Sequence, residues 1–176
     1  MSKKLFIYRH AKSDWDADYN TDHERPLAQR GIKSAAVMGR LLAASGQVPQ
    51  LVVTSSALRA RQTLEHSIQA GSWNCDIVED DSLYYGGEQA ALQLIQSLPD
   101  SISSVMLVGH EPKWSTITST LIGGGDVVFK TAVMARIDFE VESWKRVDAG
   151  AGSLRWLIPP SFFLKGNFSD SGFLEQ

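Results

Sequence analysis

The sequence contains one cysteine, Cys75, among its 176 residues. A single thiol cannot form an internal disulfide, and it cannot build the cysteine clusters that hold structural zinc or iron–sulfur groups. Residues 1–10 carry only a short apolar run that ends at Arg9, whereas a secretory signal peptide needs a longer apolar stretch and small residues at its cleavage site. These absences predict a cytoplasmic protein and exclude the class of small, disulfide-rich secreted domains.

Long hydrophobic runs and a large excess of charge are also missing. No stretch approaches the ~18 uninterrupted apolar residues of a membrane-spanning helix. Seventeen Lys and Arg residues stand against twenty Asp and Glu residues, which gives a net charge of -3 and argues against nucleic acid or an anionic membrane as partner. The 43% hydrophobic and 21% charged content is that of a folded globular chain, so we expect a single domain over residues 1–176.

Two kinds of motif that would point to a cofactor are absent as well. Residues 31–34 lack the Gly-Lys-Ser/Thr order of a Walker A loop, and no His-x-x-x-His pair occurs. The acidic run 79–81 is more typical of a solvated turn than of a Mg²⁺ site. We therefore expect neither a metal nor another cofactor.

Strand-like and helix-like segments alternate over the first 122 residues. This pattern predicts a three-layer α/β/α sandwich with a mostly parallel central sheet. Two further strands, joined by a turn around residues 148–152, are expected after Gly125, and Ser55 or Ser56 is expected to cap the second helix. Phe162, Phe163 and Leu164 are expected to pack, although residues 159–176 show no periodicity. The expected strands are 5–8, 51–53, 75–78, 105–108, 131–141 and 153–158, and the expected helices are 27–45, 87–98, 113–122 and one that contains residues 58–68.

Basic and imidazole groups follow three of the four parallel strands. Arg9 and His10 follow the first, Arg59 and Arg61 lie one helical turn after the second, and His110 follows the fourth. Each alone is typical of a solvated loop residue, but parallel strands bring their carboxyl ends to one edge of the sheet, where ligands bind. The combination predicts a positively charged pocket, and phosphate dianions are the anions that guanidinium groups bind best. Because Arg59 and Arg61 lie about 200° apart around a helix axis, only one of them can face this pocket.

Four segments resemble the histidine phosphatase superfamily, also called phosphoglycerate mutase-like. They are RHAKSDWD at 9–16, RPLAQRG at 25–31, SSALRARQT at 55–63 and VGHEP at 108–112, in the family's order and spacing. The short chain and the form of the first segment most resemble the SixA-like phosphohistidine phosphatase branch. Ala11 stands where the family usually has glycine, a substitution that still permits close packing.

The resemblance implies a role for each matching residue. His10 would be the nucleophile that becomes phosphorylated, and Arg9, Arg59 and His110 would bind the phosphoryl group. Ser13 and Lys12 would add substrate contacts. Two guanidinium groups and a protonated His110 would then supply about three positive charges without a metal. Arg61 matches no catalytic position and is assigned to structure.

The expected function is a metal-independent phosphatase that acts on phosphohistidine in a protein. Alternatives are a small-molecule phosphomonoesterase, a phosphoglycerate mutase and a non-catalytic phosphate-binding module. Partners would thus be a phosphorylated protein or a small phosphorylated substrate, and the chain is expected to be a monomer or a weak homodimer.

The choice among substrates depends on a general acid. Glu111 follows His110, and Asp14, Asp16 and Asp18 lie in the first loop, but tyrosines occupy the stretch 83–86, where a glutamate would be sought. An alkoxide needs an acid in order to leave, whereas an imidazole needs little help. A pocket without a committed acid therefore favours phosphohistidine over alkyl phosphates.

Overall fold

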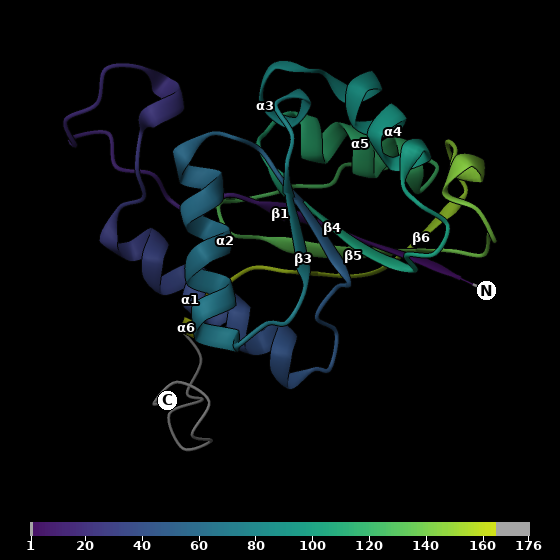
Figure 1. Ribbon diagram of the computed structural model, residues 1–176, viewed down its shortest axis with the longest axis horizontal. Coiled ribbons are helices and arrows are strands. Elements are labelled where there is room, and N and C mark those ends of the chain that lie inside the picture. The colour runs from purple at the N-terminus through teal and green to yellow at the C-terminus, as the bar shows by residue number, and fades with distance from the viewer. Residues whose placement is uncertain (1, 165–176) are drawn as a thin grey trace.

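The structure, a computed structural model, describes residues 2–164. Within this range the strands form one six-stranded sheet with helices on both faces (Figure 1). The spatial order is β3-β2-β4-β1-β5-β6. The first four of these strands run parallel, β5 pairs antiparallel with β1, and β6 pairs antiparallel with β5. The predicted mostly parallel sheet is confirmed. The strands are β1 (Lys3–Arg9), β2 (Leu51–Thr54), β3 (Asp76–Glu79), β4 (Ser104–Gly109), β5 (Met134–Phe139) and β6 (Gly152–Ile158).

The helices divide between the two faces of the sheet. α1 and α2 pack on one face, and α4 and α5 pack on the other (Figure 1). The remaining helices are short, and one of them, the one-turn helix α3, was not predicted. None of the helices in residues 2–164 is long and apolar enough to cross a bilayer. The helices are η1 (Asp22–Glu24), α1 (Gln29–Ala44), α2 (Leu58–Gly71), α3 (Ser82–Tyr85), α4 (Glu88–Ser97), α5 (Lys113–Leu121), η2 (Trp144–Arg146) and α6 (Ser161–Leu164).

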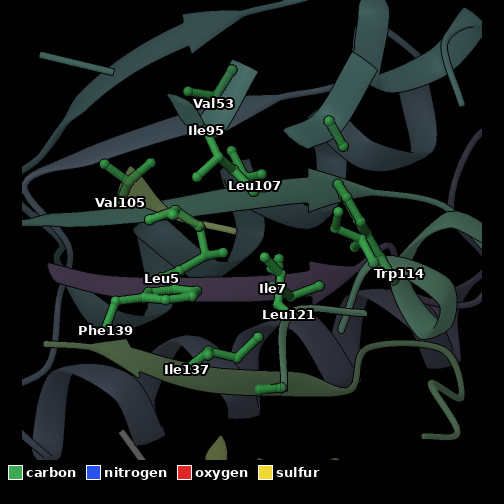
Figure 2. Packing of buried hydrophobic residues seen from close by; sticks show 14 of the residues in the cluster. Leu5, Ile7, Val53, Ile95, Val105, Leu107, Trp114, Leu121, Ile137 and Phe139 are labelled. Atoms are coloured by element: carbon green, nitrogen blue, oxygen red, sulfur yellow. The ribbon is translucent and has the colours of Figure 1, made fainter. Parts of the chain in front are cut away.

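Alternation along β1 builds two apolar layers. Leu5 and Ile7 point to the layer under α4 and α5, where they join Trp114 (Figure 2). Phe6 and Tyr8 point to the layer under α1 and α2. A parallel strand covered on both sides reads as a continuous apolar run, which is the pattern that predicted this strand. The three-layer sandwich is therefore confirmed.

The expected cap of α2 was wrong. The residue that caps α2 is Ala57, without a side-chain bond. The Ser55 hydroxyl accepts from the Ala57 amide, before the helix begins, and bonds His110, while the Ser56 hydroxyl bonds His23. The expected packing of the C-terminal apolar residues is local: the Phe162 and Phe163 ring centroids lie 5.2 Å apart, while 62% of the Phe162 surface and 45% of the Leu164 surface are exposed. Residues 165–176 of the C-terminal stretch lie outside the described residues.

Candidate active site

The ends of β1 and β4 bring His10 and His110 together. These strands pair in parallel register with Arg9 opposite Gly109, and the His10 amide donates to the Gly109 carbonyl at 2.9 Å. The two imidazole rings that follow have centroids 5.0 Å apart. The topology therefore places both histidines at the predicted edge of the sheet.

A tryptophan packs beneath this edge and requires a glycine above it. A Cβ on Gly109 would lie 2.7 Å from Cζ2 of Trp114. The buried indole donates from Nε1 to the Tyr8 carbonyl at 3.0 Å. Gly109 thus lets α5 approach the strand ends and support both histidine loops.

The His10 ring is buried and held in one tautomer. Nδ1 lies 2.7 Å from the Ala11 carbonyl, and because a carbonyl only accepts, Nδ1 carries the proton. The pKa of His10 is lowered to about 3, chiefly by burial and in addition by the charges of Arg59, Arg9 and Arg25, while the Ala11 hydrogen bond opposes the shift. At neutral pH the imidazole is uncharged, with its lone pair on Nε2, the state that a nucleophilic histidine needs.

A threonine fastens the His10 loop to α2. The Thr63 hydroxyl accepts from the Ala11 amide at 2.9 Å and donates to the Arg59 carbonyl at 2.6 Å. Thr63 is fully buried. The nucleophile loop and the helix that carries Arg59 are therefore positioned relative to each other by one side chain.

Arg59 and Arg61 occupy the opposite environments that helical geometry requires. Arg59 is buried, and its guanidinium bonds the Asp22 carbonyl at 2.6 Å and the Asp22 carboxylate at 2.9 Å. Arg61 is exposed and lies 3.5 Å from the Glu79 carboxylate. Of these two arginines, only Arg59 therefore faces the pocket. Glu79, from the acidic run 79–81, is the surface ion-pair partner of Arg61.

A third guanidinium, which was not predicted from the sequence, belongs to Arg25. This residue is 5% exposed, donates to the Ser13 hydroxyl and stacks on Trp15 with Cζ 3.6 Å from the ring centroid. Its charge also acts on His10. Ser13 is buried and positions Arg25, while its predicted contact with substrate stays a prediction. The sequence did offer one indication of a role for Arg25, because this residue is the first of the segment 25–31 that resembles the superfamily.

Asp22 links the two buried arginines of the pocket. One carboxylate oxygen lies 2.7 Å from Arg25, and the other lies 2.9 Å from Arg59 and 3.1 Å from the Tyr84 hydroxyl. Partial burial would raise the pKa of Asp22, but the hydrogen bonds and positive charges outweigh it, so that the pKa is lowered and the group is ionised. The loop carboxylate at the site is thus Asp22, whereas Asp14 accepts from the backbone of Asp16.

His110 does not carry the positive charge that was predicted for it. Burial, followed by the neighbouring His10 and Arg59, lowers the pKa of His110 far below its ordinary value. Its Nε2 lies 2.8 Å from the Ser55 hydroxyl, and Tyr84 packs edge-on at 5.4 Å. The free protein therefore holds a neutral His110, and Arg25 supplies the third positive charge in its place.

Three nitrogens of the site are buried without a hydrogen-bond partner among the described residues: Arg9 Nε, Arg59 Nε and His110 Nδ1. Arg9 is otherwise held by the Phe129 carbonyl at 2.6 Å. When the Ser55 hydroxyl donates to His110 Nε2, the proton of the neutral ring lies on Nδ1. A tetrahedral oxyanion, which only accepts hydrogen bonds, would satisfy donors of this kind.

Two other candidates make their contacts outside this cluster, although the charge of Glu111 acts on Arg9. Lys12 lines a separate cavity together with Arg30, Lys33 and Lys130. The Glu111 carboxylate accepts from the hydroxyl of Ser115 at 2.7 Å at the start of α5. Within residues 2–164 no group of three His, Cys, Asp or Glu side chains is placed to hold a metal ion.

Comparison with known sequences identifies relatives over most of the chain. The profile of the histidine phosphatase superfamily (branch 1) matches residues 5–84. An uncharacterised chloroplastic protein of Arabidopsis thaliana is 34% identical in an alignment of 169 positions that covers 90% of this chain and 76% of that protein. An uncharacterised protein of Mycobacterium tuberculosis strain H37Rv is 37% identical over 121 residues, covering 67% of this chain and 73% of its own length.

Solved structures share the fold over nearly their whole length. The SixA protein of Agrobacterium tumefaciens superposes with a TM-score of 0.76 and 28% identity, covering 90% of this chain and 98% of its own. The protein histidine phosphatase SixA in complex with tungstate gives a TM-score of 0.79 at 24% identity, with 91% and 99% covered. A mycobacterial glucosyl-3-phosphoglycerate phosphatase, at 13% identity and a TM-score of 0.63 over 88% and 98%, shares the fold alone.

Proposed function

Because this chain belongs to the histidine phosphatase superfamily and is similar to its SixA-like branch, we propose that it dephosphorylates phosphohistidine in a protein through a phosphorylated His10. One observation carries the proposal. The Ala11 carbonyl fixes the proton of a buried, neutral His10 on Nδ1, which leaves Nε2 as a nucleophile beside arginine side chains. Binding alone does not need such a nucleophile, which speaks against a non-catalytic module.

In the first step, His10 Nε2 attacks the phosphorus of the substrate. The Nε2–P bond forms and the P–N bond to the substrate imidazole breaks, and that imidazole keeps the electron pair and takes a proton from water. Arg9, Arg25 and Arg59 neutralise the charge of the phosphoryl oxygens, which is the main requirement of phosphoryl transfer. Because the guanidinium groups supply this charge, we expect activity to persist in excess EDTA.

In the second step, water attacks the phosphorus of phosphorylated His10. The Nε2–P bond breaks, its electron pair returns to His10, and inorganic phosphate leaves while the water proton passes to phosphate or solvent. The Ala11 carbonyl keeps the ring in place throughout, because it accepts from Nδ1–H in both the free and the phosphorylated state.

The carboxylates near the pocket support phosphohistidine as the substrate. Asp22 is held ionised by two arginines, and Glu111 accepts hydrogen bonds from Ser115. Asp22 therefore holds no proton to give to an alkoxide leaving group, and the Glu111 carboxylate is engaged at the start of α5. A phosphorylated imidazole leaves without such an acid, so this pocket suits it better than it suits an alkyl phosphate.

A small-molecule phosphomonoesterase is the second candidate. A cavity of about 240 Å³ adjoins His110 and is lined by Glu88 and Glu111 among others. A carboxylate that reached the leaving group from this cavity would supply the missing acid. Efficient hydrolysis of alkyl phosphates would favour this candidate.

Rapid quenching tests the proposal. A peptide phosphorylated on histidine with ³²P should transfer label to the protein, and the label should be lost in acid and retained in alkali. The His10→Ala variant should take up no label, while His66→Ala, a change on the outer part of α2, should label normally. Label that survives acid, or that persists in His10→Ala, contradicts the assignment.

A further inference from the structure

A second cavity, of about 560 Å³, lies beside the candidate active site. None of the four residues Arg9, His10, Arg59 and His110 lines it. Its volume is that of pockets that bind small organic molecules. Three parts of the chain form its wall, namely residue 12, the first half of α1 and the segment 130–131, and α6 with the two prolines before it closes one side. The lining residues are Lys12, Arg30, Lys33, Ser34, Lys130, Thr131, Pro159, Pro160, Ser161 and Leu164.

The cavity concentrates positive charge in a protein of net charge -3. Four of its lining residues are cationic, Lys12, Arg30, Lys33 and Lys130, and none of its lining residues is acidic. The ion pairs found within residues 2–164 all involve other side chains. The fold therefore gathers four like charges that no described carboxylate neutralises, and their mutual repulsion favours binding of an anion.

We propose that this cavity is a second anion-binding site that takes a small organic molecule with two or more phosphate groups. Four cations from separate segments match several negative charges better than one. The Thr131 and Ser161 hydroxyls are on the wall as additional donors to phosphate oxygens. Pro159, Pro160 and Leu164 give the cavity an apolar side, against which the carbon part of such a molecule can pack.

The cavity and the active site are formed by neighbouring positions of the chain, but none of the four active-site side chains lines the cavity. Lys12 follows Ala11, whose carbonyl holds the His10 ring. Thr131 precedes Ala132, whose amide donates to the His10 carbonyl at 3.2 Å. A ligand in the cavity would therefore lie directly behind the nucleophile loop. The inference goes beyond the proposed function and does not depend on it, because it concerns binding by other residues.

Titration calorimetry with inorganic tripolyphosphate as the probe tests the proposal. Wild-type protein should bind two equivalents, one in each site. The double variant Arg30→Glu/Lys33→Glu should keep the active-site equivalent and lose the other, or bind it at least tenfold more weakly. Arg59→Ala should have the reverse effect. Turnover of an aryl phosphate by Arg30→Glu/Lys33→Glu would show that this variant is folded.

A matched control separates a built site from a general effect of net charge. Lys145→Glu/Arg146→Glu makes the same change of charge on the exposed turn η2 and should keep both equivalents. The proposal is overturned if wild-type protein binds a single equivalent that only Arg59→Ala removes. It is equally overturned if both charge-reversal variants weaken binding to the same extent.

Discussion

The Asp22 carboxylate accepts a hydrogen bond from the guanidinium group of Arg59. One of its oxygens lies 2.9 Å from Nη2 of Arg59, and the other lies 2.7 Å from Arg25. A carboxylate and a phosphoryl group present similar oxygen acceptors to guanidinium groups. A phosphoryl group that engages these arginines must therefore displace Asp22 or share them with it.

Asp22→Asn should strengthen the binding of inorganic oxyanions. The amide removes a competing negative charge, but Asp22 is half exposed, so the gain is limited to about two- to fivefold in the inhibition constant of phosphate or tungstate. Competitive inhibition of aryl phosphate hydrolysis measures it, with Asp14→Asn as the control in the same loop. Weaker inhibition in Asp22→Asn would show instead that the carboxylate orients the arginines.

Arg59→Ala and Arg61→Ala should differ sharply in catalysis. Arg59 is buried in the pocket, and loss of one such charged donor typically costs about 10² to 10³ in kcat. Arg61 makes an exposed ion pair with Glu79, so its replacement should change the free energy of unfolding by less than about 1 kcal/mol and leave kcat within about twofold. Equal losses of kcat in two folded variants would contradict this division.

His10 should make the protein less stable in mild acid. Its pKa is lowered from 6.5 to about 3 in the fold, so between these values the unfolded chain binds a proton that the folded protein does not. Stability is therefore complete above pH 6.5 and falls, by about 1.4 kcal/mol per pH unit for each such histidine, as the pH drops toward 3.

Urea unfolding of wild type and His10→Gln from pH 7.5 to 4.5 measures this slope. His10→Gln should show a shallower decline, and the control His66→Gln should follow wild type. The remaining slope in His10→Gln reports largely on His110, whose pKa is lowered in the same direction. Parallel curves for wild type and His10→Gln would mean that His10 becomes protonated in the folded state.

The rate of turnover should depend steeply on the leaving group. Asp22 is ionised and Glu111 is bonded to Ser115, so neither of these two carboxyls is set to protonate an alkoxide, and the lack of a general acid costs about 10² to 10⁴ in rate. Values of kcat/KM for a phosphohistidine peptide and for p-nitrophenyl phosphate should therefore exceed that for 3-phosphoglycerate by at least about 100-fold. Comparable values for all three would identify an acid in the cavity beside His110.

Position in the sequence was enough to locate the parts of the site that follow strands. Arg9, His10 and His110 come directly at the ends of apolar runs, and the parallel sheet brings those ends together without further information. For Arg59 and Arg61, helix geometry limited the pocket to one of the two, and the family-like segment selected Arg59. The positions of these residues could be predicted because they follow from local periodicity, which is visible in a sequence.

Other parts of the site depend on contacts that local patterns do not display. Asp22 and Arg25 lie in a loop without periodicity, and Asp22 meets Arg59 across 37 positions of the chain. The neutral state of His110 follows from its burial among cations, which is a property of the packed site. Ser55, one of the two serines expected to cap α2, bonds His110 instead, because the packed site brings its hydroxyl within 2.8 Å of that ring.

The strand that delivers His10 is hydrogen-bonded along both edges, to β4 on one side and to β5 on the other. Its amides can exchange with solvent only when the sheet itself opens, whereas the loop of residues 11–28 can open locally at a smaller cost in free energy. His10 thus directly follows the segment expected to exchange last, and Asp22 and Arg25 stand in one expected to exchange early. We therefore expect phosphate to enter and leave through fluctuations of the loop while the strand beneath His10 remains fixed.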